Sequence, residues 1–309
     1  MEPTELSELE PEVAAAGERF ANVGDVELCW EELGDRDGEP LLLVMGLGAQ
    51  MIYWDTRFCE LLGDRGYRVI RFDNRDVGRS THLRAPIPGR AAMLLGRGRA
   101  AYRLDDLADD AIGLLDAIDV PSAHVVGASM GGMIAQVAGY RHRGRVRSLA
   151  LLMTHSGRRT VSMPTRRALA ALMARPARSR DELVEMLVRT FRVIGSPAYP
   201  FDERQFRALA GVSFDRGYNP AGVARQLHAI TASGDRTRRL REIAAPSVVI
   251  HGDRDPLIRP AAGRLIARTI PGAEFVSIGG MGHDLPEPVW PRIVDAIDRN
   301  AQRAKPAAE

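Results

Sequence analysis

The sequence predicts an α/β fold in which helices cover both faces of a mostly parallel sheet and one group of helices is inserted within the chain. Short β-rich segments alternate with helical patterns from Val26 onwards, as expected of strand–helix–strand units. Between Thr154 and Asp235 only helical patterns occur, and the alternation then resumes. The length of 309 residues fits one large α/β domain that carries such an insertion.

The individual elements follow from the periodicity of apolar residues. Leu41 to Val44 is continuously apolar, as in a central strand that is buried on both faces, whereas Val26 to Leu33 alternates as a half-buried strand does. The predicted strands, in chain order, are 26–33, 41–44, 68–72, 123–127, 146–153, 247–251 and 274–278. Helices are predicted around 58–62 and over 105–118, 130–140, 166–175, 181–193, 203–210, 221–232, 261–268 and 289–300.

These elements divide the chain into a core, a cap and two tails. The core comprises residues 19–153 and 236–300, and residues 154–235 form an inserted helical cap. Residues 1–18 are rich in glutamate and are predicted to be a disordered acidic tail, and residues 301–309 are a C-terminal tail. Because ligands of α/β proteins bind at the carboxyl ends of the parallel strands, we expect the functional residues in the loops that follow the strands.

Composition limits the possible partners. The 42 basic residues nearly balance the 40 acidic ones, so no global field favours nucleic acid or anionic lipid. No apolar run approaches the roughly 18 residues of a membrane span, and the N-terminus lacks the features of a secretory signal. The expectation is a cytoplasmic monomer or homodimer that binds a small molecule. Cys29 and Cys59, the two cysteines, are expected to be buried free thiols.

A candidate nucleophile lies where the strand 123–127 runs directly into the helix 130–140. The residues Gly127 to Gly131 read Gly-Ala-Ser-Met-Gly, which is the G-x-S-x-G pattern in its strand–turn–helix context. The two glycines are needed because the strand and helix backbones approach each other on either side of Ser129. Ser129 is therefore predicted to be exposed at a tight turn as a nucleophile rather than to serve only as a helix N-cap.

A serine hydroxyl needs a base that takes its proton, and His283 is the predicted base. It lies in a glycine-rich loop after the last strand, which lets the imidazole reach over the sheet edge. A carboxylate must in turn orient the imidazole, and two candidates follow the strand 247–251. Asp255 is preferred because Pro256 holds it extended and further into the loop, while Asp253 is expected to make turn hydrogen bonds.

The oxyanion of the tetrahedral intermediate requires two donors. The backbone N–H of Met130, directly after the nucleophile, is the first. The second is the backbone N–H of Leu47, in the segment Met45-Gly46-Leu47-Gly48 that ends a buried strand. A plain strand-to-helix turn is the alternative interpretation of that segment.

The chain resembles the α/β-hydrolase-fold serine hydrolases over about residues 20–300, and within them the esterases similar to aclacinomycin methylesterase. The motifs that carry the resemblance are residues 127–131, the block 71–80, Gly252 with Asp255, and Gly282-His283. Many members have His-Gly where this chain has Met45-Gly46. The block Asp73 to Ser80 is expected to be structural, with Arg75 or Arg79 pairing carboxylates beneath the site.

The resemblance implies hydrolysis of a carboxylic ester of a small to medium apolar substrate through an acyl-enzyme, without metal or organic cofactor. The substrate pocket is predicted to include Gly46, Trp54, His155, Met163 and Phe214. Lactonase, perhydrolase, carbon–carbon hydrolase and lyase chemistry remain open, because each can use the same three residues. A hydrolase-like receptor that binds a small signal without turnover is the alternative from another class. Epoxide hydrolases and haloalkane dehalogenases are disfavoured because they use a carboxylate where this chain has Ser129.

Overall fold

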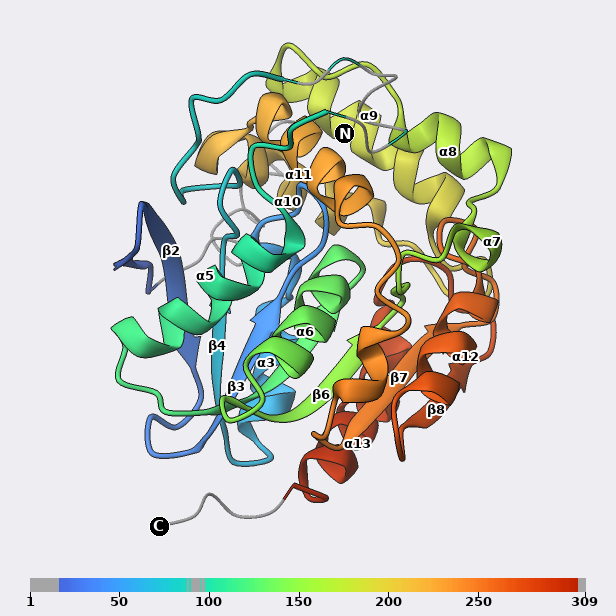
Figure 1. Ribbon diagram of the computed structural model, residues 1–309. Helices are drawn as coiled ribbons and strands as arrows, with labels where there is room; N and C mark the ends of the chain where they lie inside the picture. The colour runs from blue at the N-terminus through green and yellow to red at the C-terminus, as the bar shows by residue number, and fades with distance from the viewer. Residues whose placement is uncertain (1–16, 88, 90–94, 96–97, 305–309) are drawn as a thin grey trace.

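The computed structural model describes residues 17–87, 89, 95 and 98–304 (Figure 1). Most of the predicted acidic tail therefore lies outside the described residues, as do residues 305–309 of the predicted C-terminal tail. Glu18, which was assigned to the acidic tail, is bound in the structure. Its carboxylate accepts hydrogen bonds from Arg79 at 2.5 Å and from Arg216 at 2.7 Å. Glu18 is thus bonded to the core, one residue before the predicted start of the core at residue 19.

Eight strands form one sheet in the order β1-β2-β4-β3-β5-β6-β7-β8. β2 pairs antiparallel with β1 and β4, and every other pairing is parallel. This confirms the predicted mostly parallel sheet. The strands are β1 (Arg19–Val23), β2 (Val26–Leu33), β3 (Glu39–Val44), β4 (Tyr67–Phe72), β5 (Ala123–Ala128), β6 (Val146–Leu152), β7 (Ser247–Gly252) and β8 (Glu274–Ile278).

Helices cover both faces of the sheet (Figure 1). One face carries α5 (Leu104–Ala117), α6 (Met130–Arg141) and α12 (Pro260–Thr269), and the other carries α3 (Thr56–Gly63) and α13 (Trp290–Ala301). Short 3₁₀ turns occur as η1 (Met51–Tyr53), η2 (Arg239–Glu242) and η3 (Glu287–Val289).

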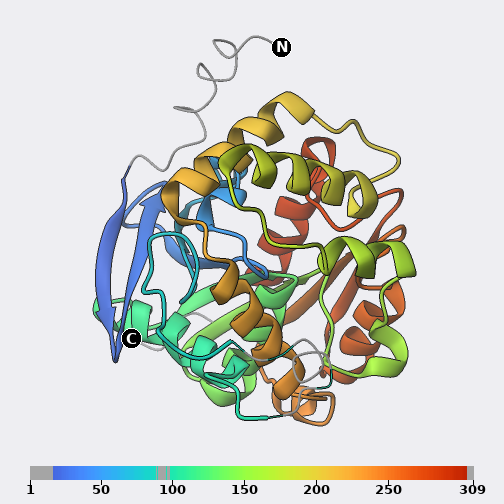
Figure 2. The ribbon, with the colours of Figure 1, turned by 90° about the horizontal axis from the view of Figure 1, so that it is seen from above.

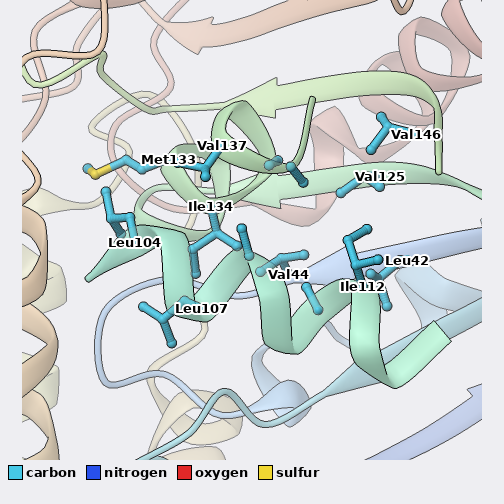
Figure 3. Close-up of a cluster of buried hydrophobic side chains, with 14 of the residues drawn as sticks. Leu42, Val44, Leu104, Leu107, Ile112, Val125, Met133, Ile134, Val137 and Val146 are labelled. Atoms are coloured by element: carbon cyan, nitrogen blue, oxygen red, sulfur yellow. The ribbon is translucent and has the colours of Figure 1, made fainter. Parts of the chain in front are cut away.

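The two sides of the core follow from the alternation of side chains along each strand. In β3, Leu42 and Val44 belong to the apolar cluster under α5 and α6, while Leu41 and Leu43 belong to the cluster under α3 and α13. All four are fully buried, which explains the uninterrupted apolar run. Figure 3 shows the first cluster, in which Leu42 and Val44 lie opposite Ile134 of α6 and Ile112 of α5.

Five helices separate β6 from β7 and lie over the carboxyl ends of the strands (Figures 1 and 2). These inserted helices are α7 (Arg159–Ser162), α8 (Arg166–Leu172), α9 (Arg180–Ile194), α10 (Glu203–Gly217) and α11 (Pro220–Ala232). The last four begin at short polar side chains that accept a hydrogen bond from a first-turn backbone N–H: Thr165, Ser179, Asp202 and Asn219. They place a second layer above the sheet edge where the candidate catalytic residues gather.

Among the strands and α-helices, three differ most from the sequence prediction. β1 was not predicted because its side chains are mostly solvent-exposed and show no apolar alternation. The four-residue α7 is too short to produce a helical period. α10 extends seven residues beyond the predicted 203–210, through Gly211. A Cβ on Gly211 would lie 2.4 Å from the guanidinium of Arg180, so this glycine admits a side chain of the neighbouring helix α9 rather than ending α10.

Within the described ranges, no helix combines the length and apolar character that crossing a bilayer requires. Cys29 and Cys59 are free thiols buried in the core, as the sequence predicts. Burial raises the pKa of both thiols to about 12, so they stay protonated and unreactive at neutral pH.

Candidate active site

Three side chains that are far apart in the sequence converge at the carboxyl edge of the sheet. Ser129 follows β5, Asp255 follows β7, and His283 follows β8. The distance from Nε2 of His283 to Oγ of Ser129 is 3.0 Å, and the distance from its Nδ1 to Oδ2 of Asp255 is 2.7 Å. Both are hydrogen-bond distances, so the imidazole bridges the hydroxyl and the carboxylate.

Ser129 occupies a strained turn that its neighbours hold in place. Its φ of +55° and ψ of −116° place a non-glycine residue in a region that L-residues rarely adopt. Its N–H donates to the carbonyl of Leu152 at 2.9 Å, and the hydroxyl of Thr154 donates to its carbonyl at 2.6 Å. Both partners lie at the end of β6, so the neighbouring strand fixes the turn that presents the hydroxyl.

The glycines beside Ser129 are required by backbone contact. A Cβ on Gly127 would lie 2.3 Å from the carbonyl oxygen of Gly131, and a Cβ on Gly131 would lie 2.0 Å from that of Val44. Neither backbone oxygen can move without displacing β3 or α6. The turn is therefore closed to any larger residue, as the sequence pattern predicts.

We expect Gly131→Ala to lower the free energy of unfolding by more than about 2 kcal/mol, because the added methyl meets backbone rather than a flexible side chain. Chemical denaturation of the parent and the variant measures this difference. Gly144→Ala is the control, since a Cβ there meets nothing within 4 Å. Equal destabilisation by the two substitutions would contradict this steric account.

Asp255 is held so that one carboxylate oxygen faces the imidazole. Its Oδ1 accepts hydrogen bonds from the N–H groups of Leu257 and Ile258, both at 2.8 Å, and its Oδ2 faces His283. Burial opposes ionisation, but the nearby His283 and His251 stabilise the charge and hold the pKa of Asp255 well below its usual range. Asp255 therefore stays ionised at any pH at which the protein would be assayed.

The other residues of this loop have structural contacts. Asp253, the rejected candidate, accepts a hydrogen bond from the N–H of Gly280 at 2.7 Å. His251 lies with Nε2 at 2.8 Å from the carbonyl of Ile258 and braces the loop that carries Asp255. The sequence predicts turn hydrogen bonds for Asp253, whereas its carboxylate binds the loop that carries His283.

The sequence predicts the backbone N–H groups of Leu47 and Met130 as donors to an oxyanion. In the described part of the chain, no acceptor binds the N–H of Leu47 or of Met130. Met130 is the first residue of α6, where helix N–H groups have no intrahelical partner. A Cβ on Gly46 would lie 3.2 Å from Cβ of Ser129, so the backbone before Leu47 packs directly on the nucleophile.

The block 73–80 ties the loops of the sheet edge to the inserted helices. The Asp73 carboxylate accepts a hydrogen bond from Arg216 of α10 at 3.0 Å. The Asp76 carboxylate accepts two hydrogen bonds from Arg225 of α11, at 2.6 and 2.8 Å. The sequence did not indicate Arg216 and Arg225, because the sequence pattern does not distinguish a buried arginine that binds a carboxylate from the many arginines at the surface. Arg75 pairs with Asp110 at 2.5 and 2.6 Å, as expected of a structural block.

A cavity of about 1930 Å³ opens at Ser129 and His283, beneath the inserted helices. Its walls are mainly apolar and include Met133, Met153, Leu183, Met186, Phe191, Leu257 and Ile258. Gly46 and His155 border it as predicted. Trp54 lies in its wall but is fully buried and stacks on Phe58, so it supports the lining.

Two predicted pocket residues are wrong. Met163 is 53% exposed and does not border the cavity, because it follows the short α7 at the surface. Phe214 stacks on Tyr218 and also lies outside the lining. The adjacent Ser213 borders the cavity instead, since neighbouring residues of a helix point in directions about 100° apart. The sequence identified the lining helix but not its inward face.

Asp284 is a lining residue that the sequence analysis did not single out. It follows His283 directly and accepts a hydrogen bond from the Ser196 hydroxyl. Burial raises the pKa of this carboxyl above its usual range. The feature of the sequence that could have identified Asp284 is its position directly after His283, the predicted base. Among the described residues, no group of three or more His, Cys, Asp or Glu side chains is arranged to hold a metal ion.

A mostly parallel sheet with a serine at the tight turn between its fifth strand and the following helix is the architecture of an α/β hydrolase. A family model described as alpha/beta hydrolase fold matches residues 39–193. The chain belongs to this family, as its resemblance predicts.

Relatives within the family place the chain among the carboxylic ester hydrolases. The rhodomycin D methylesterase of a Streptomyces strain is 31% identical, and that of Streptomyces peucetius is 30% identical. Each alignment covers 93% of this chain and 98% of the relative. The crystal structure of an enol-lactonase from Burkholderia xenovorans aligns with a TM-score of 0.72 at 24% identity, over 92% of this chain and 100% of that chain. That structure supports the fold alone.

Proposed function

We propose that this chain hydrolyses a carboxylic ester of an apolar substrate through an acyl-enzyme on Ser129. The observation that carries the proposal is the pair of hydrogen-bond distances that join His283 to Ser129 and to Asp255. Oγ of Ser129 attacks the ester carbonyl while Nε2 of His283 takes its proton. The imidazolium then returns the proton to the departing alkoxide, and a water molecule activated by the same nitrogen releases the acid.

The tetrahedral intermediate places a negative charge on the former carbonyl oxygen. The proposed donors to that oxygen are the N–H of Met130, which directly follows Ser129, and the N–H of Leu47, which directly follows the Gly46 that packs on Ser129. Because Gly46 packs against Ser129, the Leu47 donor is fixed before the substrate arrives. A preformed pair of donors requires no reorganisation as charge develops.

The cavity favours an apolar substrate that is larger than a simple short-chain ester. Its volume of about 1930 Å³ exceeds the roughly 300–1,000 Å³ typical of sites for drug-sized ligands. We therefore propose a substrate that is larger than the small to medium one predicted from the sequence. Two relatives are methylesterases by name, so a methyl ester of a bulky apolar acid is the proposed substrate class.

His155 is the proposed polar contact for this substrate within the apolar cavity. Its Nδ1 accepts the N–H of Gly157 at 2.9 Å, so the proton of the neutral ring is on Nε2. No described residue pairs with Nε2. Burial, with Arg236 nearby, lowers the pKa of His155 to about 3, which keeps the ring neutral. The ring thus offers one N–H donor to a substrate oxygen.

We expect His155→Phe to raise KM by about 3- to 10-fold with little change in kcat, because one neutral hydrogen bond to the substrate is lost. Steady-state kinetics on a methyl ester of an aromatic acid measure the effect. His155→Gln, which retains an N–H donor, is expected to recover part of the loss. A change in kcat with KM unaltered would assign His155 to the chemical step instead.

Turnover distinguishes the proposed esterase from a receptor of the same fold. The parent chain is incubated with methyl esters of apolar acids of increasing size, and release of methanol is measured. We expect catalytic turnover that improves with acyl size up to the limit of the cavity. Saturable binding of these esters without methanol release would favour the receptor.

A further inference from the structure

The loop that carries His283, residues 279–284, is bonded along its length to the segment that follows α9. The N–H of His283 itself donates to the carbonyl of Ile194 at 2.7 Å. At the other end of the loop, the Tyr199 hydroxyl donates to the carbonyl of Gly279 at 2.9 Å. Residues 194–199 belong to the inserted region between β6 and β7, so the proposed base is held by that region as well as by its own strand.

Ser196 is at the centre of these contacts. Its hydroxyl accepts the N–H of Gly282 at 2.8 Å and donates to Oδ1 of Asp284. One side chain thus binds the residues immediately before and after His283. Since a hydroxyl has one proton and two acceptor lone pairs, it can make both bonds at once.

The two segments are in direct backbone contact at this point. A Cβ on Gly282 would lie 2.3 Å from the carbonyl oxygen of Gly195 and 2.6 Å from that of Ile194. A Cβ on Gly195 would lie 3.2 Å from Oδ2 of Asp284. Glycine at position 282 is required for this approach, which brings the Ser196 hydroxyl within reach of the His283 loop.

We propose that Ser196 is a positioning residue for His283. Through Ser196, the position of the His283 ring relative to Ser129 and Asp255 depends on how the inserted helices pack against the His283 loop. The main chain of His283 sets where its ring lies, and the ring must reach Ser129 and Asp255 together. Without the hydroxyl, the N–H of Gly282 and the carboxyl of Asp284 both lose a partner, and the loop is free to shift. This inference rests on the proposed function, in which His283 is the base.

The test measures how fast Ser129 is labelled by a fluorophosphonate, a reagent from which the serine displaces fluoride with the help of its base. We expect Ser196→Ala to label about 10- to 100-fold more slowly than the parent, because small misplacements of a catalytic group cost about that much. On an ester substrate, kcat is expected to fall similarly while KM stays within about twofold. Ser196→Thr retains a hydroxyl and is expected to restore most of the labelling rate.

Ser179→Ala is the matched control. Ser179 is the N-cap of the same helix α9, and its hydroxyl accepts a hydrogen bond from the N–H of Glu182, at the end of the helix remote from His283. We expect this control to lower the melting temperature and leave the labelling rate unchanged. If Ser196→Ala melts below the assay temperature, Ser196→Cys replaces it, because a thiol fills the site but hydrogen-bonds weakly.

The outcomes separate this inference from the proposed function. Labelling of Ser196→Ala or Ser196→Cys at the parent rate overturns the positioning role, as does a Ser196→Thr variant as slow as the alanine variant. A parent that is labelled but hydrolyses no ester overturns the proposed function while the comparison of labelling rates still decides the role of Ser196. A parent that is not labelled at all overturns both.

Discussion

Ser129→Ala is expected to lower kcat on a p-nitrophenyl ester by at least about 10⁴-fold, because no other group can form the acyl-enzyme. The residual rate would come from the two backbone N–H donors and the cavity, which the substitution leaves in place. Chromogenic assay of the parent and the variant at equal concentration measures the ratio. The same variant should not be labelled by a fluorophosphonate.

Ser148→Ala serves as the control for this experiment. Ser148 is a buried serine of β6 whose hydroxyl bonds His124 at 2.8 Å, away from the candidate active site. The control is expected to retain parent-like kcat. Turnover that survives in Ser129→Ala at more than a few per cent of the parent rate would refute the assignment of the nucleophile.

The second large effect is expected for Asp255→Asn, which should lower kcat by about 10³- to 10⁴-fold. Oδ1 at this position is fixed as an acceptor by the N–H groups of Leu257 and Ile258. An asparagine must keep its oxygen there and therefore turns its NH₂ group towards Nδ1 of His283. That contact places the imidazole proton on Nε2, where the ring can no longer accept the proton of Ser129.

Asp253→Asn is the matched control, because it makes the same chemical change in the same loop. Asp253 accepts a single hydrogen bond from the N–H of Gly280, which an amide oxygen can also accept. We expect kcat within about threefold of the parent for this variant. A larger loss for Asp253→Asn than for Asp255→Asn would reverse the assignment of the carboxylate. Between pH 6 and 9, the rate of Asp253→Asn should show no step that arises from Asp255, since that carboxylate remains ionised throughout.

Local patterns in the sequence were sufficient to predict seven of the eight strands and the three candidate catalytic residues. The run Leu41 to Val44 predicts a strand buried on both faces, and the structure places alternate residues of it in opposite halves of the core. The turn at Ser129 was recognisable because Gly127 and Gly131 are sterically required where strand and helix meet. The contact that excludes a side chain at Gly127 is with Gly131, four residues further on, so a local pattern records it, whereas Gly131 itself meets the carbonyl of Val44 on a different strand.

The cavity lining was predicted less well. Met163 and Phe214 were chosen because they are apolar residues in the inserted region, yet neither faces the cavity. Which side of a helix points inwards depends on how that helix packs on its neighbours. Apolar residues of the inserted region also occur in the exposed connections between its helices, as Met163 and Phe201 show. Composition therefore indicated an apolar cavity without indicating its walls.

By itself, the sequence determined a mostly parallel sheet, an inserted helical region, and the order serine, aspartate and histidine at the ends of three strands. The tertiary structure alone decided that Arg216 and Arg225 bind the carboxylates of the block 73–80, and that Ser196 binds both neighbours of His283. Strand and turn patterns arise from steric and solvation effects over a few residues. Contacts between residues 86, 88 or 143 positions apart depend on the packing of helices onto the sheet edge, and no local pattern records them.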